Sequence, residues 1–92
     1  MANVVVTLRI MPRDTGIDLS GLEAKAKKAI VDFCSSREFK TSVQPIAFGL
    51  KALDIFFVMD ESIGSTEKLE ETIRQQDGVE SAEVTDVRRA IG

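Results

Sequence analysis

The chain has 92 residues, a length that fits one small domain with one core. Hydrophobic residues make up 43% and charged residues 29%, a balance typical of folded globular proteins rather than of disordered tails. The formal net charge of -3 argues against non-specific nucleic-acid binding, and the single cysteine, Cys34, excludes an intrachain disulfide.

The composition limits the kinds of catalytic and metal site that the protein can have, and the N-terminal stretch indicates its cellular location. The sequence contains no histidine, so the commonest general base and metal ligand is missing. The apolar stretch MANVVVTLRI is too short to span a bilayer and lacks the basic segment that begins a signal peptide. We therefore expect a cytoplasmic protein that does not insert into a membrane.

The first third of the chain predicts a strand and then a helix. Residues 3–11 are rich in β-branched side chains and are apolar on both faces, as in a central strand. Apolar residues at helical spacing then predict a helix from about Gly21 to Cys34. Ser20 and Glu23 fit a capping box at its start, in which two side chains satisfy free backbone amides.

The middle of the chain predicts a hairpin of two strands. Residues 38–48 favour an edge strand, because Pro45 cannot donate to a sheet ladder. Residues 50–60 form the second strongly apolar strand, and a short turn at Phe48 and Gly49 joins the two.

The last third predicts a second helix and a final edge strand. Residues 66–77 have a narrow apolar stripe, with Ser65 placed to cap the helix, and residues 79–90 form a more polar strand. The order strand, helix, strand, strand, helix, strand predicts an α+β fold, the ferredoxin-like βαββαβ sandwich, within a single domain of residues 1–92. It has a four-stranded antiparallel sheet with two helices on one face, and the two most apolar strands lie in its middle.

No motif for covalent, metal or cofactor chemistry stands out. The loop after the first strand lacks the paired cysteines of a metal-carrying domain of this fold, and the glycines are too dispersed to cradle a phosphate. Cys34 ends an apolar helix face and reads as a structural thiol. Phe56 is a candidate stacking residue for RNA, but the other aromatic and basic positions of that signature are missing.

Two features admit a functional interpretation beside a structural one. Phe48 lies at a bend, where it either folds back onto the edge of the core or is exposed as an anchor for a protein partner. Arg88 and Arg89 are either a solvated basic pair or a cation at the end of the last strand that reaches into an anionic site.

The stretches PIAFGLKALDIFFVMDESIGSTEKLEETI and GVESAEV, with the basic residues near the C-terminus, resemble the translation elongation factor 1-beta family. The likeness is to its short archaeal form and to the C-terminal exchange domain of its eukaryotic form. It implies guanine nucleotide exchange on the GTPase elongation factor 1-alpha, without covalent chemistry, a cofactor or direct nucleic-acid binding.

The resemblance also implies roles for particular residues. The partner-binding aromatic of the family falls on Phe48, in a turn with Gly49 and followed by Lys51. The near-terminal lysine of the family, which enters the magnesium and phosphate region of the GTPase, falls on Arg89, with Arg88 one residue away. Arginine is bulkier than lysine and planar, which is a departure from the eukaryotic pattern.

A second hypothesis comes from a different class of protein. Small ferredoxin-like domains also serve as regulatory domains that dimerise through their sheets and bind a metabolite. Such a protein would need neither Phe48 nor the C-terminal arginines, so an exchange assay separates the two hypotheses.

Overall fold

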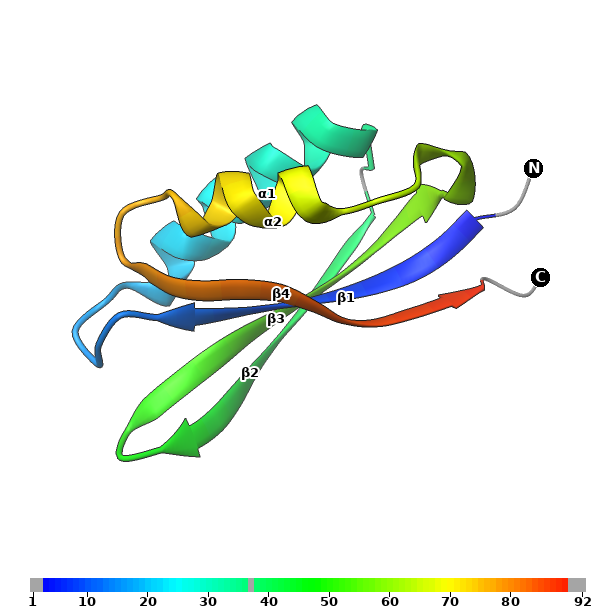
Figure 1. Ribbon diagram of the computed structural model, residues 1–92. Helices are drawn as coiled ribbons and strands as arrows, with labels where there is room; N and C mark the ends of the chain where they lie inside the picture. Colours follow the sequence, from blue (N-terminus) through cyan, green and yellow to red (C-terminus); the bar gives the residue numbers. More distant parts are fainter. Residues whose placement is uncertain (1–2, 37, 90–92) are drawn as a thin grey trace.

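The computed structural model describes residues 3–36 and 38–89 and shows the predicted order of elements (Figure 1). Ala90, the last residue of the predicted final strand, lies outside the described residues. The elements are β1 (Asn3–Pro12), α1 (Leu19–Cys34), β2 (Phe39–Ala47), β3 (Leu50–Asp60), the 3₁₀ helix η1 (Glu61–Ile63), α2 (Glu67–Arg74) and β4 (Val79–Arg89).

The four strands form one antiparallel sheet in the order β2-β3-β1-β4. The two most apolar strands are thus central and the two weaker ones are edges, as predicted. Figure 1 shows both helices on one face of the twisted sheet, which leaves the other face open. The ferredoxin-like α+β prediction is confirmed.

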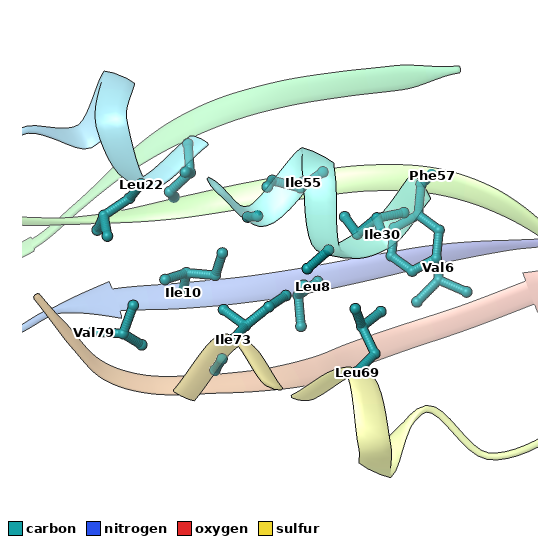
Figure 2. Close-up of a cluster of buried hydrophobic side chains, with 14 of the residues drawn as sticks. Val6, Leu8, Ile10, Leu22, Ile30, Ile55, Phe57, Leu69, Ile73 and Val79 are labelled. Atoms are coloured by element: carbon teal, nitrogen blue, oxygen red, sulfur yellow. The ribbon is translucent and has the colours of Figure 1, made fainter. Parts of the chain in front are cut away.

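One hydrophobic core lies between the sheet and the helices (Figure 2). Alternate residues of β1 and β3 point into it, as the period of two in the sequence predicts. Each fully buried aliphatic or aromatic side chain contributes about 1.5–3 kcal/mol relative to leaving it exposed. The largest fully buried side chains are Phe57, Leu8, Ile10, Ile30, Leu53, Ile55, Leu69, Ile73 and Val6.

Helix α1 begins earlier than the capping-box pattern predicts. Its N-cap is Asp18, whose carboxylate accepts a hydrogen bond from the backbone N–H of Ser20 at 3.1 Å. Glu23 accepts instead from Lys27 Nζ at 2.9 Å, so the predicted capping box is wrong. The earlier start brings Leu19 into the helix, where it packs against the core.

Helix α2 is shorter than predicted and ends at Arg74 rather than at residue 77. It begins at Glu67 with Thr66 as its N-cap, so the prediction of Ser65 as the cap is one residue off, although the Ser65 hydroxyl accepts a hydrogen bond from the backbone N–H of Glu67 at 3.1 Å. Only two of its side chains, Leu69 and Ile73, are buried, which is enough to seat two helical turns against β4.

The sheet is longer than the helix layer and extends past it at both ends. The β2–β3 hairpin projects beyond the helices at one end, and the start of β1, the end of β3 and the end of β4 lie together at the other (Figure 1). The candidate site residues of the sequence lie at these two ends.

Candidate functional site

A two-residue turn, Phe48 and Gly49, joins β2 to β3 between the paired residues Ala47 and Leu50. Both turn residues have positive φ, 52° for Phe48 and 81° for Gly49, as a type I′ hairpin turn requires. Glycine adopts this left-handed region freely, whereas phenylalanine is strained there by roughly 1–2 kcal/mol. The Phe48 side chain is 100% exposed, which excludes the alternative that it folds back onto the core.

Phe48 is not isolated, because Val43 and Ile46 of β2 are also exposed. We call these three residues the hairpin tip. Ile46 lies at a β-bulge that follows Pro45, and a bulge bends an edge strand and increases its twist. Lys51 is exposed on β3 directly opposite Pro45. The hairpin therefore carries three exposed apolar side chains and an exposed cation, groups that suit contact with another protein.

The two C-terminal arginines lie on opposite faces of the sheet. In antiparallel pairing, directly opposed residues share a face. Arg89 opposes Val4, a core residue, so Arg89 lies on the side that carries the helices. Arg88 opposes Val5 and lies on the open face.

A β-bulge at Thr85 determines which arginine takes which face. The pairing with β1 slips by one residue there, because Val84 and Asp86 oppose consecutive residues of β1. Without the slip, strict alternation from Val84 would place Arg88 on the helix side and Arg89 on the open face. The bulge reverses the two assignments.

Each arginine forms an ion pair on its own side of the sheet. Arg88 Nε lies 2.7 Å from an Asp86 carboxylate oxygen. Arg89 Nη2 lies 3.3 Å from Glu61 Oε1, in the 3₁₀ helix that follows β3. Both guanidinium groups remain largely exposed, so both are accessible to a partner.

Two apolar side chains of the neighbouring elements are exposed as well: Val87, two residues before Arg89 on β4, and Ile63, two residues after Glu61 in η1. With Glu61 they make up a surface that we call the β4 end. Sequence reasoning missed Ile63 and Val87, as it missed Val43 and Ile46. For Ile63 the available signal was a single isoleucine within a polar loop, whereas Val87 required knowledge of the bulge.

The structure does not bring the two sets of predicted site residues together. Phe48 precedes Leu50 at the start of β3, whereas Arg89 lies in the same row of the sheet as Met59 near its end. The stretch of β3 from Leu50 to Met59 spans about 30 Å at about 3.3 Å per residue. The hairpin tip and the β4 end are therefore separate exposed surfaces at opposite ends of the sheet (Figure 1).

Cys34 has the environment of a structural thiol. Its Sγ donates to the carbonyl of Ile30 at 3.4 Å, and the side chain packs against the core. Burial raises the pKa of the thiol, which disfavours the reactive thiolate. Phe56 is half-buried on the open face, opposite Lys40 of β2.

A half-buried ion pair lies in the middle of the open face. Asp54 is buried, and its two carboxylate oxygens accept from Arg9 Nε at 2.9 Å and Arg9 Nη2 at 3.1 Å. The hydrogen bond to Asp54 raises the pKa of the Arg9 guanidinium. Because the two residues are directly opposed on β1 and β3, the pair supports the register of the central strands.

Residues 3–36 and 38–89 contain no group of three or more side chains that could hold a metal ion. Within the same residues, no helix has both the length and the apolar character needed to cross a membrane.

Comparison with known proteins identifies close sequence relatives of the whole chain. A family model described as the EF-1 guanine nucleotide exchange domain matches residues 5–90. The chain is 41% identical over 90 residues to elongation factor 1-beta of Staphylothermus marinus, which covers 97% of this chain and 98% of the relative. Elongation factor 1-beta of Methanobrevibacter smithii is also 41% identical, with the same coverage. The Sulfolobus acidocaldarius protein of that name is 39% identical over 88 residues, 95% of this chain and 96% of the relative.

Among solved structures, the BLUF protein BlrP1 aligns with all of this chain and 57% of its own, with a TM-score of 0.56 and 10% sequence identity. At that identity the likeness concerns the fold alone, and the ferredoxin-like sandwich carries many unrelated functions.

Proposed function

The chain belongs to the EF-1 guanine nucleotide exchange domain family and is a guanine nucleotide exchange factor of translation elongation, and we propose that it acts on the GTPase elongation factor 1-alpha. It releases GDP by binding and does no covalent chemistry. Its place of action is the cytoplasm, where elongation occurs. Nothing in the relatives favours the alternative of a metabolite-binding regulatory domain.

The physical basis of exchange is thermodynamic linkage. A GTPase holds its nucleotide through backbone amides, a lysine and a Mg²⁺ ion that bridges the phosphates. An exchange factor binds the nucleotide-free GTPase more tightly than the GDP-bound form. The factor then weakens GDP binding by the same ratio by which GDP weakens binding of the factor.

The single observation that carries the proposed contact is Phe48. A fully exposed aromatic held in a strained turn contributes little to the fold, which points to a role outside the fold. An aromatic anchor in a partner pocket commonly contributes ~2 kcal/mol or more to binding. Val43 and Ile46 add exposed apolar side chains to the same hairpin, while Gly49 supplies the second left-handed residue of the turn.

The β4 end supplies the cation. Arg89, on the helix side and paired with Glu61, approaches the magnesium and phosphate region of the GTPase. A positive charge near the ion raises its electrostatic energy there and favours its release. Arg88 faces the opposite side of the sheet, which supports Arg89 as the acting residue.

The separation of about 30 Å between the two surfaces constrains the partner. A GTPase that contacts both must offer an apolar pocket at one place and its nucleotide site at another, with this chain lying lengthwise between them. Binding energy gained at the hairpin tip then offsets the cost of disturbing the nucleotide site. Contacts at the nucleotide site itself add little to the affinity of this chain for the GTPase.

The test is release of a fluorescent GDP analogue from elongation factor 1-alpha in excess GTP. We expect the release rate to rise with the concentration of this chain and to saturate, and excess Mg²⁺ to slow the catalysed release. The exposed residue Lys25 on α1, which belongs to neither the hairpin tip nor the β4 end, offers a control: Lys25→Ala should act like the unmodified chain. A release rate that is independent of this chain at high concentration would overturn the proposal.

A further inference from the structure

We propose that Glu61 is a positioning residue for exchange: its carboxylate holds the Arg89 guanidinium in the orientation from which it reaches the nucleotide site. The inference rests on the proposed function, in which Arg89 supplies the cation. It adds a residue that acts through Arg89 rather than on the partner directly.

Glu61 is held in place by the structure around it. It begins the 3₁₀ helix η1, which is capped by Asp60 through a hydrogen bond from the backbone N–H of Ser62 to the Asp60 carboxylate at 2.9 Å. At the other end of η1, the Gly64 N–H donates to the Glu61 carbonyl at 3.2 Å, and Gly64 has a φ of 80°. The Glu61 backbone is thus fixed at the end of the central strand β3.

Arg89, in contrast, stands at the end of an edge strand and has a long side chain with many rotamers. An arginine that must be ordered for function loses this rotamer freedom, and a fixed carboxylate nearby reduces the loss. The bulge at Thr85 places Arg89 on the side where η1 lies, whereas Arg88 pairs with Asp86 on the open face. The bulge and the capped turn together create the pair.

The ion pair with Glu61 restrains the Arg89 guanidinium but does not occupy all of its hydrogen-bond donors. The Arg89 side chain is 73% exposed and the Glu61 side chain 43%, with Nη2 and Oε1 3.3 Å apart. A guanidinium has five N–H donors, so donors remain for an acceptor in the partner. The ion pair with Glu61 thus orients the positive charge of Arg89. Because the pair is weak and solvated, it can break when Arg89 binds the partner.

The experiment compares Glu61→Gln with the matched control Asp86→Asn in the exchange assay, over a full concentration series. We expect Glu61→Gln to lower the maximal release rate by about two- to fivefold, the range set by the strength of exposed ion pairs. The concentration for half-saturation should stay unchanged, because the hairpin tip still binds. Glu61→Asp should restore part of the rate, and Asp86→Asn should leave it unaltered.

A double-mutant cycle separates positioning from a direct role. If Glu61 acts through Arg89, Glu61→Gln has no effect in the Arg89→Ala background. An equal effect in both backgrounds, or full activity of Glu61→Gln beside an impaired Arg89→Ala, would overturn the inference while leaving the exchange function intact. Failure of the unmodified chain to accelerate release would instead overturn the proposed function, and the inference with it.

Discussion

Replacing Phe48 by asparagine should stabilise the fold and weaken partner binding at once. The turn requires positive φ at both of its residues, and Asn-Gly is the preferred pair for such a turn. Asparagine tolerates the left-handed region, which removes most of a strain of roughly 1–2 kcal/mol. The lost side chain is 100% exposed, so the fold loses no packing. We expect a net gain of about 1 kcal/mol.

The gain in stability corresponds to a rise in melting temperature of about 4–8 °C for a domain of this size. Loss of an aromatic anchor should cost ~2 kcal/mol of binding, roughly a 30-fold rise in Kd for the nucleotide-free GTPase. Thermal unfolding and titration calorimetry on the same preparation measure the two effects. Phe48→Tyr is the matched control, since it keeps both the ring and the strain and should resemble the unmodified chain in both assays.

Phe48→Asn should raise the stability of the fold and lower the affinity for the partner, so a single variant tests both effects. A drop in melting temperature for Phe48→Asn would mean that the ring packs on the fold in solution, contrary to its full exposure. An unchanged Kd would remove Phe48 from the interface, whatever the stability. Only higher stability together with weaker binding agrees with a partner-binding aromatic whose backbone is strained in the turn.

Two further predictions concern the opposite end of the sheet. In the GDP-release assay, Arg89→Ala should lower the maximal exchange rate with little change in affinity, whereas Arg88→Ala should be nearly normal. Arg89→Lys should retain more activity than Arg89→Ala. Full activity of the Arg88→Ala/Arg89→Ala double variant in this assay would exclude a terminal cation from the mechanism. The hydrogen bond from the Ser62 N–H lowers the pKa of Asp60 from its ordinary value of 3.8, so the cap contributes fully above that value and is lost as the pH falls through the lower, folded-state pKa. An NMR titration of the Ser62 amide should therefore show a midpoint below 3.8, and a midpoint at or above it would contradict the cap.

The sequence by itself determined the elements, their order and the layout of the sheet. Alternation along β1 and β3 marks the buried faces because side chains alternate strictly in a strand, and that rule is local. Pro45 and the polar character of residues 79–89 mark the edge strands, because neither suits the middle of a sheet. Phe48 and Gly49 are recognisable as a turn, and the resemblance of the surrounding stretch indicates the exchange family from the sequence alone.

The sequence determines the helix ends less well, because residues that could each serve as a helix cap lie close together. Asp18 and Ser20 both suit an N-cap, and the choice depends on whether Leu19 can reach the core. That is a question of packing across the sheet, which propensity at a single position does not encode. The end of α2 at Arg74 follows likewise from where the chain must turn to enter β4.

The tertiary structure alone decided which arginine faces which side. Reading outward from Val84, strict alternation gives the wrong face for both Arg88 and Arg89, because a single bulged residue at Thr85 shifts the register. A bulge is a property of two paired strands, and neither strand's sequence specifies it. The same holds for the pairing of Arg89 with Glu61, residues far apart in the chain that meet only because β4 lies beside β1 and η1 follows β3.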